Sequence, residues 1–359
     1  MSEYKYFMGG TTAKGYVNFY ENLIEQLDHV LYIEGGHTSL ISPLLKDVAY
    51  QMKNQLNIDY IYNHIQRNEL EGIVFTDLNA GIFDRSKMNI RRMKWPLIKE
   101  SLLFFGEGYS KEGLTEKKQL LVELEKQIEE VHTLAVQSFQ AALTIHHEVE
   151  DVYAPYMDFE KADRETERLK NDIFEKNKLN KPSCVHHRYL GAATPDGPRD
   201  FIQNLTSQVS RRIFMKGNSG SGKSTVLRKI AREAQDRGFD VEVYHCGFDP
   251  TSLDMVTLPE LEVAMFDATG PHEHDPSLIS DEELNLSDQL MTQDLPKREQ
   301  QRVSLLKMDY RVKVDEATAY LKRVKELQDE FERIYHENTI PEFYNVAKEE
   351  LMNWVDERK

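Results

Sequence analysis

The chain has 359 residues, of which 40% are apolar and 30% charged, a size and composition that suit two ordinary globular domains. Its formal charge of −16 at pH 7 argues against general nucleic-acid binding, because neutralising phosphates requires clustered Lys and Arg. No apolar run reaches the ~18 residues of a membrane span, and no secretory signal opens the sequence. We therefore expect a cytoplasmic protein without membrane partners.

One internal repeat organises the chain, with an offset of 182 residues. Residues 7–23 align with residues 189–205, and residues 35–49 align without a gap with residues 217–231. Five of the fifteen positions in the second pair are identical, which is beyond coincidence. We therefore predict a tandem duplication. Its halves are residues 1–182 and 183–359.

Each half is predicted to end in a helical tract, about residues 96–180 and 277–359. Apolar side chains recur at helical spacing from about residue 116 to residue 153, and residues 313–335 are the counterpart. Pro155 and Pro341 are expected to break the tracts before a returning helix. We expect each tract to form a helical hairpin that packs on its own core or on its twin, with a protein partner as the alternative.

The second half predicts an α/β core. Residues 213–215 are expected to form a strand, residues 223–237 a helix, and residues 240–246 and 261–267 two further strands. The last of these is almost wholly apolar, as in a strand buried on both faces of a parallel sheet. The repeat extends this prediction to both halves. The predicted fold is two tandem P-loop NTPase-like α/β halves with mainly parallel sheets, with cores at about 4–90 and 186–276.

The second half also contains the motif Gly-x-x-x-x-Gly-Lys-Ser at residues 217–224, between a predicted strand and a predicted helix. Its glycines let backbone N–H groups turn toward a phosphate, and the helix N-terminus favours negative charge. Lys223 is expected to contact the β- and γ-phosphates and Ser224 to hold Mg²⁺. The motif predicts a site for one nucleoside triphosphate, ATP or another, with Mg²⁺. The predicted binding residues are Gly217, Asn218, Ser219, Gly220, Ser221, Gly222, Lys223, Ser224 and Thr225.

Acidic and histidine side chains follow the predicted strands, at the sheet edge where α/β proteins bind ligands. Asp267 is the candidate second group on Mg²⁺, with a turn-capping acid as the alternative. Asp249 is a candidate acid near the γ-phosphate, or an ordinary Asp-Pro turn. His272 is a candidate for orienting the attacking water, or a bystander in a surface loop. With Lys223, these three are the predicted catalytic residues.

The first half has a degenerate version of the loop. Leu40 and Ile41 stand where the motif has its last glycine and its lysine. We therefore expect no phosphate cradle there and a structural or regulatory role for this half. Its basic residues Arg85 and Arg92 are candidates for an arginine finger across an internal pseudo-dimer.

The sequence resembles an uncharacterised bacterial family of tandem P-loop ATPases. The resemblance rests on the lysine-bearing loop, on HCGFDPTSLD at residues 245–254 and on PELEVAMFDATGPHEHDP at residues 259–276, and it covers nearly the whole chain. It implies ATP or a related nucleotide as the ligand.

These features favour an ATPase in which water attacks the γ-phosphate. A small-molecule kinase and a nucleotide-gated switch protein with negligible turnover are the alternatives. The guanine-reading pattern Asn-Lys-x-Asp does not occur, which favours ATP over GTP.

Overall fold

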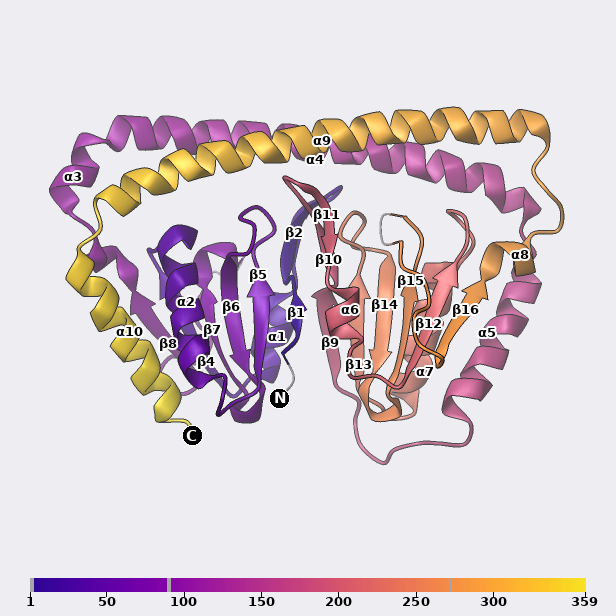
Figure 1. The fold of residues 1–359 in the computed structure, drawn as a ribbon, viewed down its shortest axis with the longest axis horizontal. Helices are drawn as coiled ribbons and strands as arrows, with labels where there is room; N and C mark the ends of the chain where they lie inside the picture. The colour runs from indigo at the N-terminus through magenta and orange to yellow at the C-terminus, as the bar shows by residue number, and fades with distance from the viewer. Residues whose placement is uncertain (1–2, 89–91, 271–272) are drawn as a thin grey trace.

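The computed structural model describes residues 3–88, 92–270 and 273–359. Two α/β halves lie side by side, and a pair of long helices runs above both of them (Figure 1). Within the described part of the chain, no helix is both long enough and apolar enough to cross a membrane.

The first sheet is formed by residues from the first 104 positions. Its strands are β1 (Lys5–Tyr6), β4 (His29–Glu34), β5 (Ile58–Tyr62), β6 (Leu70–Phe75), β7 (Ala80–Asp84) and β8 (Glu100–Phe104). Their order is β1-β5-β6-β7-β4-β8. All neighbours are parallel except β6, which is antiparallel to β5 and β7.

The second sheet repeats this pattern. Its strands are β9 (Val185–Tyr189), β12 (Arg211–Lys216), β13 (Val241–His245), β14 (Leu253–Leu258), β15 (Val263–Asp267) and β16 (Asp281–Asn285). Their order is β9-β13-β14-β15-β12-β16, and β14 is the antiparallel strand. The prediction of a mixed α/β fold with mainly parallel sheets is confirmed. The strands β8 and β16 lie beyond residues 90 and 276, where the sequence suggested that the cores end.

The remaining elements are helices, short turns of 3-10 helix and two hairpins. The helices are α1 (Tyr20–Gln26), α2 (Thr38–Met52), α3 (Lys111–Glu116), α4 (Lys118–Tyr153), α5 (Phe159–Phe174), α6 (Ile202–Leu205), α7 (Lys223–Asp236), α8 (Leu286–Leu290), α9 (Lys297–Glu337) and α10 (Pro341–Asp356). The 3-10 turns are η1 (Thr76–Leu78), η2 (Arg85–Lys87), η3 (Phe105–Gly108), η4 (Ala154–Tyr156) and η5 (Pro259–Leu261). The hairpins are β2 (Gly9–Thr12) with β3 (Gly15–Asn18), and β10 (Gly191–Thr194) with β11 (Gly197–Asp200).

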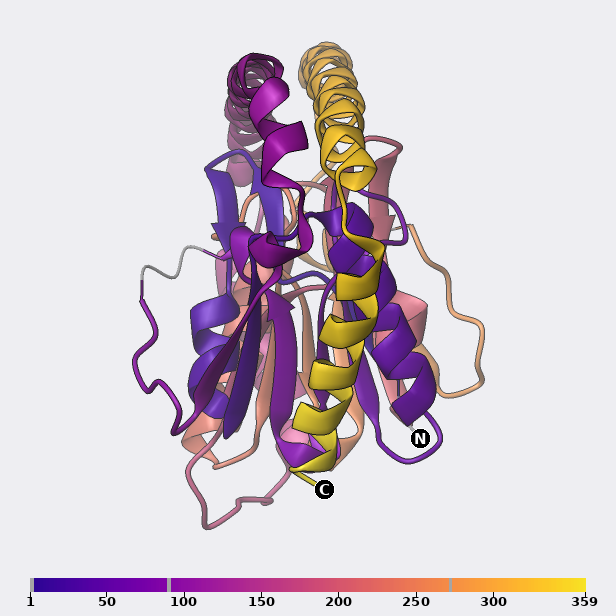
Figure 2. The same ribbon diagram turned by 90° about the vertical axis from the view of Figure 1, so that its left-hand side faces the viewer.

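The returning helices are exchanged between the halves. Helix α10 comes from the end of the chain, yet it buries Leu351 and Val355 in the core formed by α2 and the first sheet. Helix α5 belongs to the first repeat in sequence, yet it buries Leu169 and Phe174 in the core formed by α7 and the second sheet. Figure 1 shows α5 and α10 at opposite ends of the molecule, and Figure 2 shows α10 running along the first half. Each apolar helix face is therefore covered by the core of the other sequence repeat.

The two halves meet around a pseudo-two-fold axis. Phe7 and Tyr189 are equivalent in the repeat, and each donates a backbone hydrogen bond to the other, at 3.1 and 2.9 Å. Equivalent residues that pair with each other are typical of a two-fold contact. Above this seam, α4 and α9 lie along one another (Figures 1 and 2) and bury residues such as Phe139 and Leu321 between them and the hairpins. The long helices therefore connect both halves.

Candidate functional site

Residues 217–222 connect β12 to α7 at the carboxyl end of the second sheet. Gly217, Gly220 and Gly222 have φ angles of 150°, 77° and 88°, which L-amino acids rarely adopt. A Cβ atom on Gly217 would lie 2.7 Å from Ser221 Oγ. The loop thus takes a path that requires glycine, and it delivers the chain directly into the first turn of α7.

The first turn of α7 presents backbone donors that the described part of the chain leaves unpaired. Among the described residues, no acceptor contacts the N–H groups of Gly222, Lys223 or Ser224. Only Ser221 N–H is paired within the loop itself, with Asn218 O at 3.1 Å. Unpaired amides at the positive end of a helix dipole form a binding place for an anion. The geometry therefore fits a phosphate group.

Lys223 lies over this loop and is largely buried. Its Nζ atom donates hydrogen bonds to Gly217 O at 2.6 Å and to Asn218 O at 3.2 Å. The same atom lies 3.6 Å from Asp267 Oδ2. The ammonium group therefore joins the start of the loop to the acid at the end of β15.

Asp267 is held in its own turn as well as beside the lysine. Its Oδ1 atom accepts hydrogen bonds from Thr269 N–H at 2.9 Å and Thr269 Oγ1 at 2.5 Å. Burial raises the pKa of Asp267, and the neighbouring Lys223 opposes that rise. Both the metal-binding and the turn-capping interpretation of Asp267 are compatible with these contacts.

Sequence reasoning missed a second acid, Asp254. Strand β14 is antiparallel, so its first residues lie beside the last residues of β15, and Met255 pairs with Phe266. Asp254 is buried, and its negative charge adds to the rise in the pKa of Asp267. The repeat contained the signal, because after a slip of one residue Asp254 aligns with the acid Glu71.

The hydroxyl of Ser224 accepts a backbone hydrogen bond that has an equivalent in the first half. Its Oγ atom accepts a hydrogen bond from Leu253 N–H at 2.9 Å, and Ser42 Oγ accepts one from Leu70 N–H at 2.8 Å. This bond alone is no sign of a metal site, since the degenerate loop keeps it. Ser224 Oγ also accepts a longer hydrogen bond from Arg228 Nη2 at 3.4 Å, so Mg²⁺ at this oxygen would take the place of the arginine.

The other predicted site residues lie in different surroundings. Asp249 accepts two hydrogen bonds of 2.9 Å from Thr251 Oγ1 within its own turn, which favours the Asp-Pro turn. Thr225 is exposed. Asn218 N–H donates to Ser287 Oγ at 2.7 Å, so α8 supports the start of the loop. His272 lies outside the described residues.

The first-half loop pairs the N–H groups of Leu40 and Ile41, the counterparts of Gly222 and Lys223. Leu40 N–H and Ile41 N–H both donate to His37 O at 2.9 Å, and Ser39 N–H donates to Glu332 Oε2 at 2.8 Å. Ile41, at the position of the motif lysine, is fully buried in the core. These contacts agree with the expectation that no phosphate cradle forms in this half.

The proposed arginine finger is wrong for Arg85 within one chain. Arg85 donates to Glu34 Oε2 at 2.5 Å and lies over the ring of Tyr32, inside the first half. The glycine-rich loop follows β12, the fifth strand from the seam in the second sheet. Arg85 is thus fixed in the opposite half by an ion pair and a ring contact. Arg92 is an exposed residue of the same first half.

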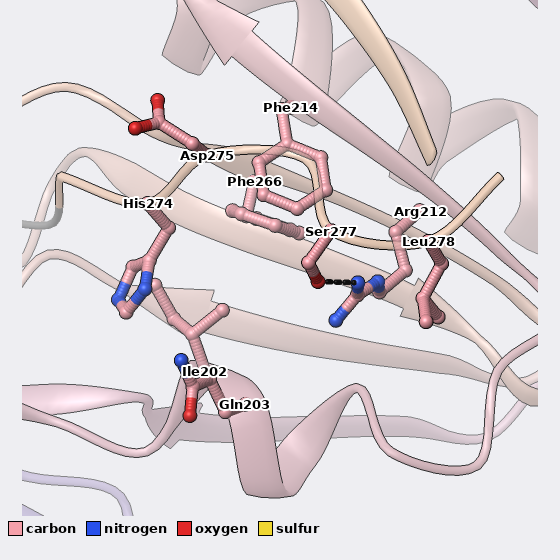
Figure 3. Close-up of a pocket in the computed structure, with 9 residues that line it drawn as sticks. All are labelled: Ile202, Gln203, Arg212, Phe214, Phe266, His274, Asp275, Ser277 and Leu278. Carbon is pink, nitrogen blue, oxygen red and sulfur yellow. Dashed lines mark hydrogen bonds between the residues drawn. The ribbon is translucent and has the colours of Figure 1, made fainter. Parts of the chain in front are cut away.

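A separate cavity of about 270 Å³ lies on the other face of the second sheet (Figure 3). Arg212, Phe214 and His274 line it. Arg212 is already paired with Asp281 at 2.6 Å and donates to Ser277 Oγ at 3.0 Å. The cavity therefore offers no unpaired charge for a ligand, and it does not include the glycine-rich loop.

The fold and loop together define a mixed α/β protein with two six-stranded, mostly parallel sheets and, in the second one, a glycine-rich loop leading into a helix whose first N–H groups have no acceptor among the described residues. Scans against known protein families, curated proteins and solved structures match nothing. Within residues 3–88, 92–270 and 273–359, no group of three or more His, Cys, Asp or Glu forms a ready-made metal site.

Proposed function

We propose that the protein binds one Mg-ATP through the loop at residues 217–224 and hydrolyses it, with the first half in a structural or regulatory role. The observation that carries this proposal is the set of N–H groups at Gly222, Lys223 and Ser224, for which residues 3–88, 92–270 and 273–359 supply no acceptor. The equivalent first-half turn donates Leu40 N–H and Ile41 N–H to His37 O. The contrast supports a phosphate ligand in the second half alone.

The residues present fit a triphosphate with Mg²⁺. The amides and Lys223 would bind the phosphates, and Ser224 with Asp267 or Asp254 would hold the metal ion, which supplies charge neutralisation at the phosphates. Asp254 is buried and Asp267 is partly buried, so their charges act in a medium where electrostatic interactions are stronger than in water. The proposal also places the chain with tandem P-loop ATPases of the cytoplasm.

The test is calorimetry with Mg-ATP and Mg-GTP on the wild-type protein and on Lys223→Ala. Removing the ammonium group should weaken ATP binding by about 10- to 100-fold, because hydrogen bonds to charged groups contribute about 1.5–3 kcal/mol. Lys229→Ala is the matched control. Lys229 lies on the same helix, but it pairs with Asp163 on α5. Equal affinity in the wild-type protein and Lys223→Ala would refute the proposal.

The nucleotide-gated switch stays the second candidate, because α4 lies directly over the loop, with Glu150 against Gly220. Tight Mg-ATP binding without phosphate release would favour the switch. Release only with an added acceptor would favour the kinase. Exposed apolar side chains on α9, namely Leu305, Met308 and Val312, support a protein partner for the helical pair.

A further inference from the structure

The two long helices place equivalent acids over the two loops. Glu150 on α4 and Glu332 on α9 are related by the offset of 182 residues. Glu332 lies over the first-half loop and accepts a hydrogen bond from Ser39 N–H. Glu150 lies over the second-half loop, where its Cα and Cβ atoms are 3.3 Å from the position that a Cβ on Gly220 would take. The same helix position therefore meets the equivalent loop in both halves, at adjacent loop positions, because Gly220 corresponds to Thr38, next to Ser39.

In the first half, the carboxylate of Glu332 takes the place of a phosphate. It binds a backbone amide at the start of α2, as an anion does at a helix N-terminus. The aromatic ring of Tyr335 lies 4.0 Å from the ring of His37 and covers the same turn. Helix α9 is thus fixed to the degenerate loop by an internal anion and a ring contact.

In the second half, the equivalent acid contacts the loop without binding its amides. Ser221 N–H, the counterpart of Ser39 N–H, donates to Asn218 O instead. The carboxylate of Glu150 lies 3.5 Å from His146 Nε2, one turn earlier on α4. The loop therefore keeps its donors, while a negative charge stays beside it.

We propose that Glu150 is a built-in competitor of the nucleotide phosphates, so that nucleotide binding and the docking of α4 on the loop oppose each other. This inference rests on the proposed function. The triphosphate brings several negative charges into a cradle next to Glu150, and like charges at this range repel across a partly buried surface. Helix α4 packs along α9, and Glu332 attaches α9 to the first-half loop. A shift of α4 therefore changes the helix contacts of both halves.

The experiment measures Mg-ATP affinity by calorimetry for the wild-type protein, Glu150→Gln, Glu148→Gln and Lys223→Ala. Glu148 is the matched control, because it is an exposed acid on the same helix and its substitution makes the same charge change. Glu150→Gln should bind Mg-ATP about three- to tenfold more tightly than the wild-type protein, and more so at low salt. Glu148→Gln should match the wild-type protein.

Hydrogen exchange gives a second readout. Mg-ATP should change the protection of residues 143–153 in the wild-type protein, and less so in Glu150→Gln. Unchanged or weaker affinity in Glu150→Gln, with binding still weakened in Lys223→Ala, would overturn this inference alone. If the wild-type protein and Lys223→Ala bind Mg-ATP equally, the proposed function is wrong and this inference is wrong with it.

Discussion

Asp254 near the start of β14 and Asp267 at the end of β15 lie on neighbouring strands of the second sheet. They are close enough for the charge of Asp254 to raise the pKa of Asp267. Two acids at one metal ion serve catalysis more than nucleotide affinity, since the loop itself binds the phosphates. We expect Asp254→Asn to lower phosphate release by about 10- to 100-fold while Mg-ATP affinity changes little.

The control is Glu71→Gln, the same kind of change at the equivalent first-half acid. It should leave phosphate release as in the wild-type protein. Normal release in Asp254→Asn would remove this acid from the proposed mechanism.

Glu71 itself makes stability depend on pH. It is buried and accepts hydrogen bonds from Tyr20 Oη at 2.6 Å and Asn63 Nδ2 at 3.2 Å. Burial raises the pKa of Glu71 from an ordinary 4.5 to about 8. The folded protein therefore holds a proton that the unfolded chain releases near pH 4.5.

The direction of the pH dependence of stability follows from this difference in pKa between the folded and unfolded states. The contribution of Glu71 is fully present below pH 4.5 and is lost as the pH rises to about 8. We expect the difference in Tm between Glu71→Gln and the wild-type protein to grow in favour of the variant from pH 5 to pH 8.5. Thermal unfolding over this range measures it, and parallel curves for the two proteins would contradict it.

The sequence predicted the residues of the loop but not the groups that surround it. Glycine-rich loop chemistry is local, so the spacing of Gly217, Gly222 and Lys223 could be recognised directly. Asp254 and Glu150 come from a neighbouring antiparallel strand and from a helix of the preceding tract. No local pattern indicates which distant segment will face a loop, and only alignment of the two halves gives a hint.

Among the elements, the exchanged helices α5 and α10 depart most from what the sequence suggested. Their apolar spacing predicted amphipathic helices, and the two prolines predicted where each tract breaks. An amphipathic pattern shows that a helix needs a core, but not which core, when two related cores are available. The lengths of α4 and α9, 36 and 41 residues, carry the chain to the far half.

Leu351 and Leu169 provide a matched test of this exchange. They are equivalent in the repeat, and each is buried in the core of the other repeat. Replacing either by Ala should lower the free energy of unfolding by about 2–5 kcal/mol, through lost burial and a residual cavity. Chemical denaturation measures the loss.

Hydrogen exchange shows which core each substitution destabilises, and this distinguishes the exchanged arrangement from one in which each helix packs on its own half. Leu351→Ala should increase hydrogen exchange in α2, whereas Leu169→Ala should increase it in α7. Glu350→Ala, next to Leu351 but exposed, is the control and should leave exchange unchanged. If Leu351→Ala increased hydrogen exchange in α7 instead, α10 would pack on the second core, and the exchanged arrangement would be contradicted.

At the scale of the whole molecule, the exchange makes the two sequence repeats inseparable. Residues 1–182 contain α5, whose apolar face packs on the second core, and residues 183–359 contain α10, which covers the first. Either half alone would expose both an apolar helix face and the part of its core that this face should cover. Such paired exposure leads to association rather than to a stable monomer.

We therefore expect the fragments 1–182 and 183–359, expressed together, to form a 1:1 complex with the mass of the intact chain. Expressed singly, each should aggregate or form a dimer in which two copies exchange their helices. Light scattering coupled to size exclusion gives the masses. The control is the intact protein cleaved at a protease site inserted near residue 182. The cleaved protein should keep the mass of the intact chain, because the contacts that join the halves do not depend on the peptide connection at that site. A monomeric fragment 183–359 that unfolds cooperatively would show that the second half is an independent domain after all.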